Sequence, residues 1–203
     1  LAIVLGIVVG LCLVAYLWVV PWLGERYAMS YSKEDEISMG EAMYSSITSL
    51  YPADERKTEM VNKFYQQLQY NVDYPVKITV VESSEVNAFA IPGGHIIMFD
   101  AILEKMKTPE ELAALLGHEV SHVSLRHSLR NMFRSLARKM FLALIISDDT
   151  GVLSAAIDHA DDLKGLEYSR ALETEADNSG LKMMTESGMD PQGMVRLMEL
   201  LKK

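Results

Sequence analysis

The chain has 203 residues, a length that fits one domain preceded by a membrane segment. Its formal net charge of −9 argues against a nucleic-acid-binding protein, so we expect no nucleic-acid partner. The single cysteine, Cys12, excludes an internal disulfide and leaves a reducing compartment open.

The chain begins with a long apolar run that is typical of a membrane anchor. Residues 1–20 contain no charged side chain, and as a helix they would span about 30 Å, the thickness of a bilayer's hydrocarbon core. Tyr16, Trp18 and Trp22 lie at its end, where aromatic residues gather at membrane interfaces. A signal peptide is the alternative, but its apolar core is shorter, about 7–15 residues, and no small-residue cleavage site is evident. We therefore expect a single-pass anchor over residues 1–24, and the few flanking basic residues do not indicate its side.

Residues 25–203 have the pattern of one α+β domain, mostly helical with a small sheet. A helix is expected over residues 32–50, with Ser32 as its N-cap and an apolar stripe along it. A second helix is expected over residues 54–71, where Met60, Phe64 and Leu68 are spaced by four.

Three strands are expected next, followed by a short helix over residues 100–107. The strands cover residues 76–81, 86–91 and 95–99. The Pro92-Gly93-Gly94 sequence before the third strand reads as a turn. His95 is adjacent to that turn, and we expect it at a solvated strand end.

A central helix is predicted to begin at Thr108 and to run to about His127. Thr108 and Glu111 form a capping box, and Pro109 suits the first helical position. On a continuous helix His127 would point about 140° away from His122, so we expect only a structural role for it.

This helix carries His118-Glu119-Val120-Ser121-His122, the H-E-x-x-H motif of zinc proteases. Residues four apart lie one turn above each other on a helix, so both imidazoles can reach one ion. Glu119 can then take the proton of a water that the ion activates. An ordinary helix that happens to carry these side chains is the alternative, but burying them without partners would be costly. A catalytic zinc site usually needs a third protein ligand, which must come from elsewhere.

Basic residues recur after the motif. The stretch from Arg126 to Lys139 contains arginines at every fourth position, apolar residues between them and no acid. It is either the solvated face of an ordinary helix or a basic amphipathic helix that lies on anionic lipid beside the anchor.

Residues 147–165 read as a loop, and the helix that follows can supply the missing ligand. Glu173 and Asp177 lie four apart, on one helical face. Glu173 can bind the ion, and Asp177 can accept the free N–H of a ligating histidine and fix its tautomer. Glu175 is about 200° from Glu173 on the helix and should point elsewhere. The last helix is expected over residues 191–201.

The chain resembles peptidase family M48, and its Oma-like and BepA-like members more than the multi-span HtpX and CAAX prenyl proteases. The motifs that carry the resemblance are His118–His122, Glu173-x-x-x-Asp177 preceded by Ser169-Arg170, and Asn87-Ala88-Phe89-Ala90-Ile91-Pro92-Gly93-Gly94. The similarity runs from about residue 32 to the end.

The resemblance implies a zincin-type fold and a defined set of site residues. One zinc ion per chain would be held by His118, His122 and Glu173, with Glu119 as the general base and Asp177 behind the ligands. The strand with Asn87, Ala88, Phe89 and Ala90 would edge the cleft, where an extended substrate peptide adds as a further strand.

Two further roles are open. A donor to the oxyanion is usual in such sites, and Arg170 and Tyr168 are candidates because they are close to Glu173 in the sequence. His159, in the preceding loop, is either a removable fourth ligand that gates the enzyme or an ordinary solvated histidine.

Together these patterns predict a membrane-anchored zinc metalloendopeptidase that acts on proteins or peptides, of the kind that serves membrane or envelope quality control. A bacterial inner membrane is expected, with a mitochondrial inner membrane as the other possibility. The alternatives are a proteolytically quiet chaperone or scaffold that keeps the metal site, and a zinc hydrolase of other substrates. The sequence indicates no oligomeric state.

Overall fold

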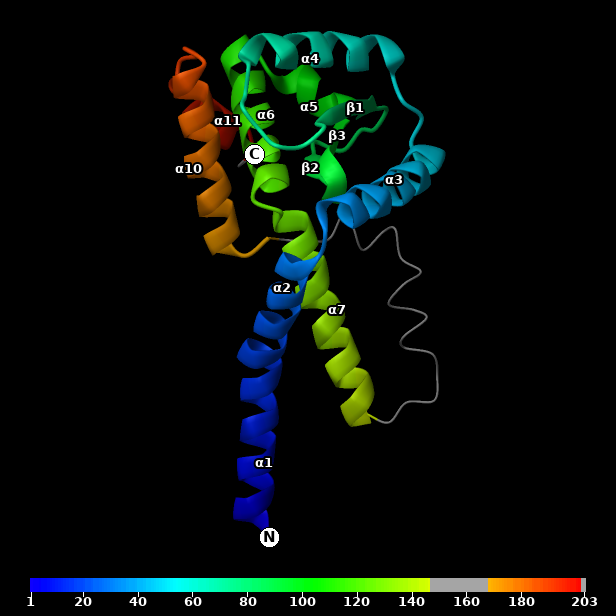
Figure 1. The fold of residues 1–203 in the computed structure, drawn as a ribbon. Coiled ribbons are helices and arrows are strands. Elements are labelled where there is room, and N and C mark those ends of the chain that lie inside the picture. The colour runs from blue at the N-terminus through cyan, green and yellow to red at the C-terminus, as the bar shows by residue number, and fades with distance from the viewer. Residues whose placement is uncertain (147–167, 202–203) are drawn as a thin grey trace. The chain divides into compact units, whose positions relative to one another are not determined.

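The computed structural model describes residues 1–146 and 168–201, which belong to two compact units (Figure 1). The first unit holds Leu1–Ser32 and the segment that starts at Leu129. The second holds Lys33–Ser128 and the C-terminal helices. His159 and the predicted loop over residues 147–165 lie outside the described residues.

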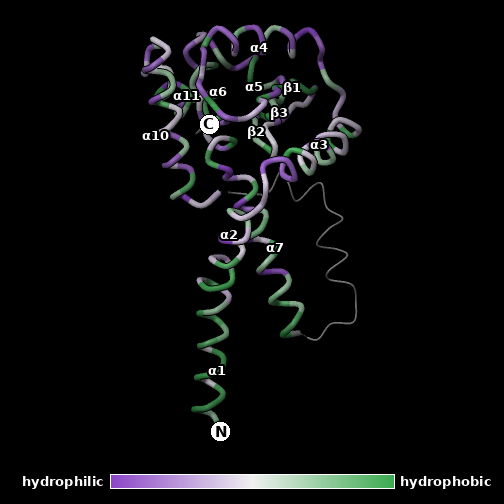
Figure 2. The backbone as a smooth tube through the Cα atoms, viewed as in Figure 1, coloured by the Kyte–Doolittle hydropathy of each residue, from purple (hydrophilic) through white to green (hydrophobic). Residues whose placement is uncertain are grey.

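The first unit begins with a helical run from Ala2 to Ser30. It consists of α1 (Ala2–Val14), a π-helical turn (Ala15–Val19) and α2 (Val20–Ser30), and α1 is largely apolar along its length (Figure 2). Among the described helices it alone has the length and composition to cross a membrane, a property that signal sequences share. The helix continues past Pro21, because the widened turn before it accommodates the proline ring and its missing N–H.

Within this unit α2 packs against α7 (His127–Ile146). An added Cβ at Gly24 would collide with the backbone carbonyl of Phe133, so glycine is what allows the close approach. Beside this contact Nε of Arg130 donates to Glu25 at 2.8 Å. One arginine of the basic stretch is therefore already paired with an acid.

The second unit contains one three-stranded sheet in the order β1-β3-β2. β1 (Lys77–Val81) lies parallel to the central β3 (His95–Phe99), and β2 (Ala88–Ala90) pairs antiparallel with β3 and forms an edge. All five residues of β3 are buried, as its apolar sequence leads one to expect for a strand covered on both faces. The predicted α+β class with three strands is confirmed, with the first two strands shorter than expected.

His95 is buried, so the prediction of a solvated strand end was wrong. Its ring stacks on Tyr44 with 4.5 Å between centroids, and its Nε2 lies 3.3 Å from Glu41. The reason is that Pro92–Gly94 forms a short 3-10 turn, η2, against α3 (Lys33–Leu50) rather than an open loop. Gly40 permits this contact, since a Cβ there would collide with the Pro92 carbonyl.

The other helices of the second unit surround α6. They are α4 (Glu55–Leu68), α5 (Asp100–Lys105), α6 (Pro109–Ser124), α10 (Arg170–Glu186) and α11 (Gln192–Leu201). Helix α6 contacts α10 and α11 as well as β2 and β3, as Figure 1 shows. This packing buries 11 of its 16 residues and makes it the core of the unit.

The start of α6 differs in detail from the predicted capping box. The Thr108 hydroxyl makes no capping bond there, whereas Glu111 accepts a hydrogen bond from the backbone N–H of Lys107 at 2.7 Å. Only the glutamate half of the box is formed, one residue earlier than expected.

Candidate metal centre

Helices α6 and α10 come almost into backbone contact at Gly117 and Gly180. A Cβ added to Gly180 would lie 2.9 Å from the carbonyl carbon of Gly117 and 2.9 Å from the backbone nitrogen of His118. A real side chain essentially never tolerates such a separation from backbone. The two glycines therefore bring the acidic face of α10 up to the histidines of α6.

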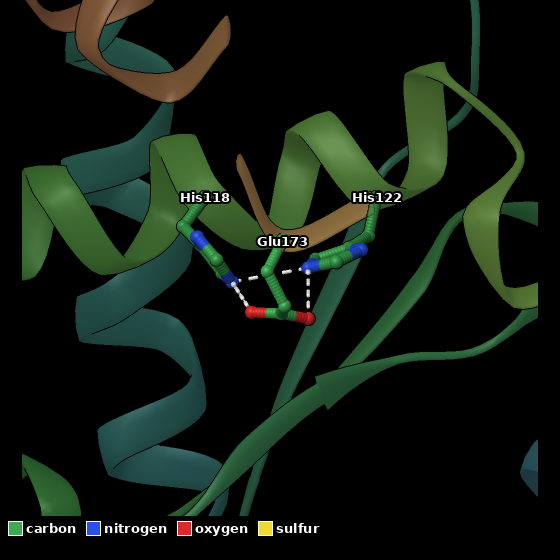
Figure 3. A group of neighbouring side chains, drawn as sticks. All are labelled: His118, His122 and Glu173. Atoms are coloured by element: carbon green, nitrogen blue, oxygen red, sulfur yellow. Dashed lines mark hydrogen bonds and ion pairs between the residues drawn. The ribbon is translucent and has the colours of Figure 1, made fainter. Parts of the chain in front are cut away.

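His118, His122 and Glu173 converge on one point (Figure 3). The Nε2 atoms of the two histidines are 3.0 Å apart, and oxygens of Glu173 lie 3.6 Å from His118 and 3.7 Å from His122. Tetrahedral zinc with bonds of about 2.0–2.2 Å separates its ligand atoms by about 3.3 Å, a value that these distances bracket. Two imidazoles and one carboxylate are also a donor set that zinc takes, so the residues fit this ion.

Asp177 fixes the tautomer of His118. Its Oδ1 lies 2.9 Å from Nδ1 of His118, and an ionised carboxylate only accepts hydrogen bonds, so that nitrogen carries the proton. The lone pair of Nε2 then points toward His122 and Glu173. A lone pair that faces a second ring nitrogen and a carboxylate marks a place for a cation.

The protonation of the three residues also suits a metal site. Burial is the main cause that lowers the pKa of His122, so this ring is neutral. Burial opposes the charge on His118 too, but the hydrogen bond to Asp177 and neighbouring acidic charges outweigh it and raise its pKa. Burial raises the pKa of Glu173, partly offset by His118. A proton and a metal ion therefore compete for these ligands.

Glu119 is buried beside these three residues, and one of its carboxylate oxygens is uncommitted. The backbone N–H of Ala90 donates to its carboxylate, while Oε2 has no hydrogen-bond partner within the described part of the chain. Burial raises the pKa of Glu119 to about 7. A carboxyl group with this pKa can both accept and release a proton near neutral pH.

A cavity of about 220 Å³ opens next to Glu119, His118, His122 and Glu173. Its walls come from β2, α5, α6, α10 and α11. The remaining residues around it are Asn87, Ala88, Ile102, Leu115, Tyr168, Asp177, Leu197, Met198 and Leu201. The predicted strand residues Asn87 and Ala88 thus border the same space as the predicted metal ligands.

The pairing of β2 shows which of its backbone groups face outward. The N–H of Ile91 bonds to His95 and the carbonyl of Asn87 accepts from Phe99, so alternate residues, Phe89 included, bond to β3. Ala88 and Ala90 therefore turn their N–H and C=O groups away from the sheet.

At Ala90 both outward groups already have partners. The N–H donates to Glu119, and the carbonyl accepts from Oγ of Ser128 at 2.7 Å. Ala88 is the residue of β2 whose outward groups remain available at the cavity, as judged from the described residues.

The structure separates the two predicted oxyanion donors. Tyr168 stacks on His122 with 4.0 Å between ring centroids, and its hydroxyl lies 2.7 Å from Oγ of Ser128. Burial raises the pKa of Tyr168, so the hydroxyl keeps its proton. Arg170, the first residue of α10, is exposed and is not among the residues around the cavity.

His127 lies against the metal centre, so the prediction that it points away was wrong. The backbone is left-handed at Arg126, with φ of +57°; α6 ends at Ser124 and the next helix starts at His127. Nδ1 of His127 is 3.0 Å from Nδ1 of His122, and its Nε2 is 3.1 Å from Glu175. Glu175, which was expected to point away from Glu173, is not in the converging group and contacts His127 instead. No glycine or proline marks this break, and a left-handed arginine gives no signal in the sequence.

Comparisons with known proteins agree with this geometry. A family model described as peptidase family M48 matches residues 53–202. The beta-barrel assembly-enhancing protease of Yersinia pestis is 27% identical over 196 residues, which cover 89% of this chain and 40% of that protein. The mitochondrial metalloendopeptidase OMA1 of Schizosaccharomyces pombe is 30% identical over 200 residues, which cover 94% of this chain and 59% of that protein. Metalloprotease YcaL of Escherichia coli is 33% identical over 132 residues, which cover 63% of this chain and 51% of that protein.

The chain therefore spans between 40% and 59% of the length of these relatives. The matched range includes the whole of α6 and α10, and with them all three converging side chains. Because the family model covers most of the sequence, this chain belongs to peptidase family M48.

Proposed function

We propose that this chain is a zinc-dependent metalloendopeptidase that cleaves proteins or peptides at a membrane. The main support is the convergence of His118, His122 and Glu173 beside the uncommitted oxygen of Glu119. One zinc ion per chain would be held by the first three side chains, with Asp177 orienting His118. The names of the relatives, which include protease and metalloendopeptidase, support the same activity.

The side chains around the site have distinct roles in this proposal. Zinc held there would polarise the scissile carbonyl and lower the pKa of the attacking water. Glu119 takes the proton of that water and delivers it to the leaving amine, for which a pKa of about 7 is suited. The N–H of Ala90 holds one carboxylate oxygen, so Oε2 is the one that moves the proton. Tyr168 is better placed than Arg170 to donate to an oxyanion, because it borders the cavity and stays protonated. Its hydroxyl, which donates to Ser128 in this structure, would have to turn its proton toward the oxyanion.

The substrate is proposed to bind as an added strand. An extended peptide beside β2 would exchange hydrogen bonds with the outward N–H and C=O of Ala88, next to the cavity. The corresponding groups of Ala90 are occupied, so the added strand would pair at Ala88 and beyond it toward Asn87.

The apolar run is proposed to anchor the chain in a membrane, over residues 1–24, ahead of a catalytic domain over residues 25–203. A bacterial inner membrane or a mitochondrial inner membrane fits, and a role in membrane-protein quality control is proposed with it. Arg126 donates to Glu36 in the second unit, as Arg130 does to Glu25 in the first. Contact with anionic lipid is proposed for the Arg126–Lys139 stretch as a whole.

The test uses the full chain in detergent with casein as substrate. Digestion should stop with a chelator and return with zinc. Glu119→Gln should reduce turnover by about 10²–10⁴-fold while zinc binding persists, because the general base is lost and the ligands are kept. Glu104→Gln, which removes a largely exposed carboxylate on α5, is the matched control. Digestion that survives both the chelator and Glu119→Gln would contradict the proposal.

A further inference from the structure

His122 is the ligand whose second ring nitrogen meets no carboxylate. Nδ1 of His118 bonds to Asp177, whereas Nδ1 of His122 lies 3.0 Å from Nδ1 of His127. The other nitrogen of His127 lies 3.1 Å from Oε2 of Glu175. Both rings are buried, with 1% of His122 and none of His127 exposed, so water does not take the place of these bonds.

The residues His122, His127 and Glu175 form a series of hydrogen bonds. The carboxylate of Glu175, at its end, determines where each proton lies. An ionised carboxylate can only accept, so Nε2 of His127 must donate to Glu175. A neutral imidazole with its proton on Nε2 has a lone pair on Nδ1, and that lone pair requires a donor. The donor is Nδ1 of His122, which leaves Nε2 of His122 unprotonated and facing His118 and Glu173.

We propose that Glu175 and His127 are positioning residues that hold His122 in the tautomer able to bind a metal ion. This inference rests on the zinc site of the proposed function. Helix α10 then serves both histidines: Glu173 is a ligand, Asp177 sets the tautomer of His118, and Glu175 acts on His122 through His127. Partners behind metal-bound histidines raise ligand basicity and fix ring orientation, and their loss typically weakens metal binding.

Glu175 is the best position for the test, because its side chain is 49% exposed and its replacement leaves the core intact. Zinc affinity of the full chain in detergent is measured by competition with a chelating indicator. Glu175→Ala should weaken zinc binding by about 10–100-fold. Glu175→Gln should lose less zinc affinity than Glu175→Ala, because the glutamine amide oxygen can still accept a hydrogen bond from His127. Glu186→Ala, which removes an acid at the end of the same helix, should bind zinc as the wild type does.

A second measurement separates positioning from a structural role. The chain has five histidines, so selective nitrogen-15 labelling allows their tautomers to be read by NMR in metal-free protein. The wild type should show His122 protonated on Nδ1 and His127 on Nε2, and Glu175→Ala should give mixed tautomers. His122 protonated on Nε2 in the wild type, or unchanged zinc affinity in Glu175→Ala, overturns the inference. Failure of the wild type to bind zinc would contradict the proposed function, and the tautomers would still test the hydrogen-bond series.

Discussion

Arg126 forms the turn that carries His127 back to the metal centre. A left-handed backbone costs a non-glycine residue about 1–2 kcal/mol, so something must hold it. Nε of Arg126 donates to Oε2 of Glu36 at 2.7 Å, and the hydroxyl of Tyr74 donates to the same oxygen at 2.9 Å. Because Glu36 is only 2% exposed, this buried ion pair fixes the turn between α6 and α7.

Arg126→Ala should lower the free energy of unfolding by about 3 kcal/mol, because it leaves the buried carboxylate of Glu36 without its cation. Urea denaturation in detergent measures the loss. The double variant with Glu36→Gln should recover part of it. Lys33→Ala, which breaks an ion pair with the exposed Asp73, should have little effect. If Arg126→Ala costs no more than Lys33→Ala, the pair does not hold the turn.

Helical spacing was enough to predict which proposed site residues share a helical face. It failed for His127, which contacts one of them from outside that helix. The four-residue intervals in α6 and α10 required His118 to lie over His122 and Glu173 over Asp177. The place of His127 depends on a backbone reversal that is stabilised by a residue 90 positions away. Periodicity within one helix contains no information about such a contact.

Among the elements, the crossing of α6 and α10 decides whether the proposed metal ligands meet. Gly180→Ala places a methyl group against the backbone of Gly117, where nothing flexible can yield. Overpacking of this kind costs about 1–3 kcal/mol, more than the roughly 1 kcal/mol that alanine gains in a helix. The variant should therefore melt at a lower temperature and bind zinc more weakly, as calorimetry and an indicator assay would show.

Gly6→Ala is the matched control for this change, because an added methyl group there meets nothing within 4 Å. It should leave zinc binding unchanged and should not lower the melting temperature. Full zinc affinity in Gly180→Ala would mean that the close approach of the helices does not position Glu173.

The edge strand β2 offers a test of substrate binding. Ala88→Pro removes the outward N–H without removing a bond to β3, so the fold should persist. Loss of one neutral hydrogen bond of about 1 kcal/mol should raise KM for an extended peptide about fivefold, with kcat little changed. Steady-state kinetics measures this. Ala88→Val keeps the N–H and adds bulk, so an equal rise in KM for that variant would show that size, not the hydrogen bond, is responsible.

The strands themselves were predictable from their β-branched and aromatic residues, whereas their order was not. β1 pairs in parallel with β3, and β2, although it comes between them in the sequence, lies outside. Pairing across such distances depends on packing against α6 rather than on local pattern. The edge position of β2 is therefore something that only the structure reveals.

On the scale of the whole chain, the proposed metal site joins segments that are distant in sequence. The bond between His118 and Asp177 links residues 59 positions apart, and Glu173 reaches the same histidine from the same helix. A metal ion bound between α6 and α10 would hold these segments together only in the folded state. Binding and folding are therefore coupled.

Zinc should accordingly raise the melting temperature of the full chain. At a free concentration of about 100 times its Kd, zinc adds about 2.7 kcal/mol to the free energy of unfolding. For a chain of this size that corresponds to a rise of about 5–10 °C, which differential scanning calorimetry can measure.

Two variants assign this rise to particular side chains. Glu173→Ala should abolish it, because the proposed ligand from α10 is gone. Glu119→Gln should retain it, because in the proposed mechanism Glu119 moves protons and does not hold the ion. An equal rise in Glu173→Ala and the wild type would show that α10 supplies no ligand. Loss of the rise in Glu119→Gln would instead make Glu119 a ligand, and the proton transfer would need another residue.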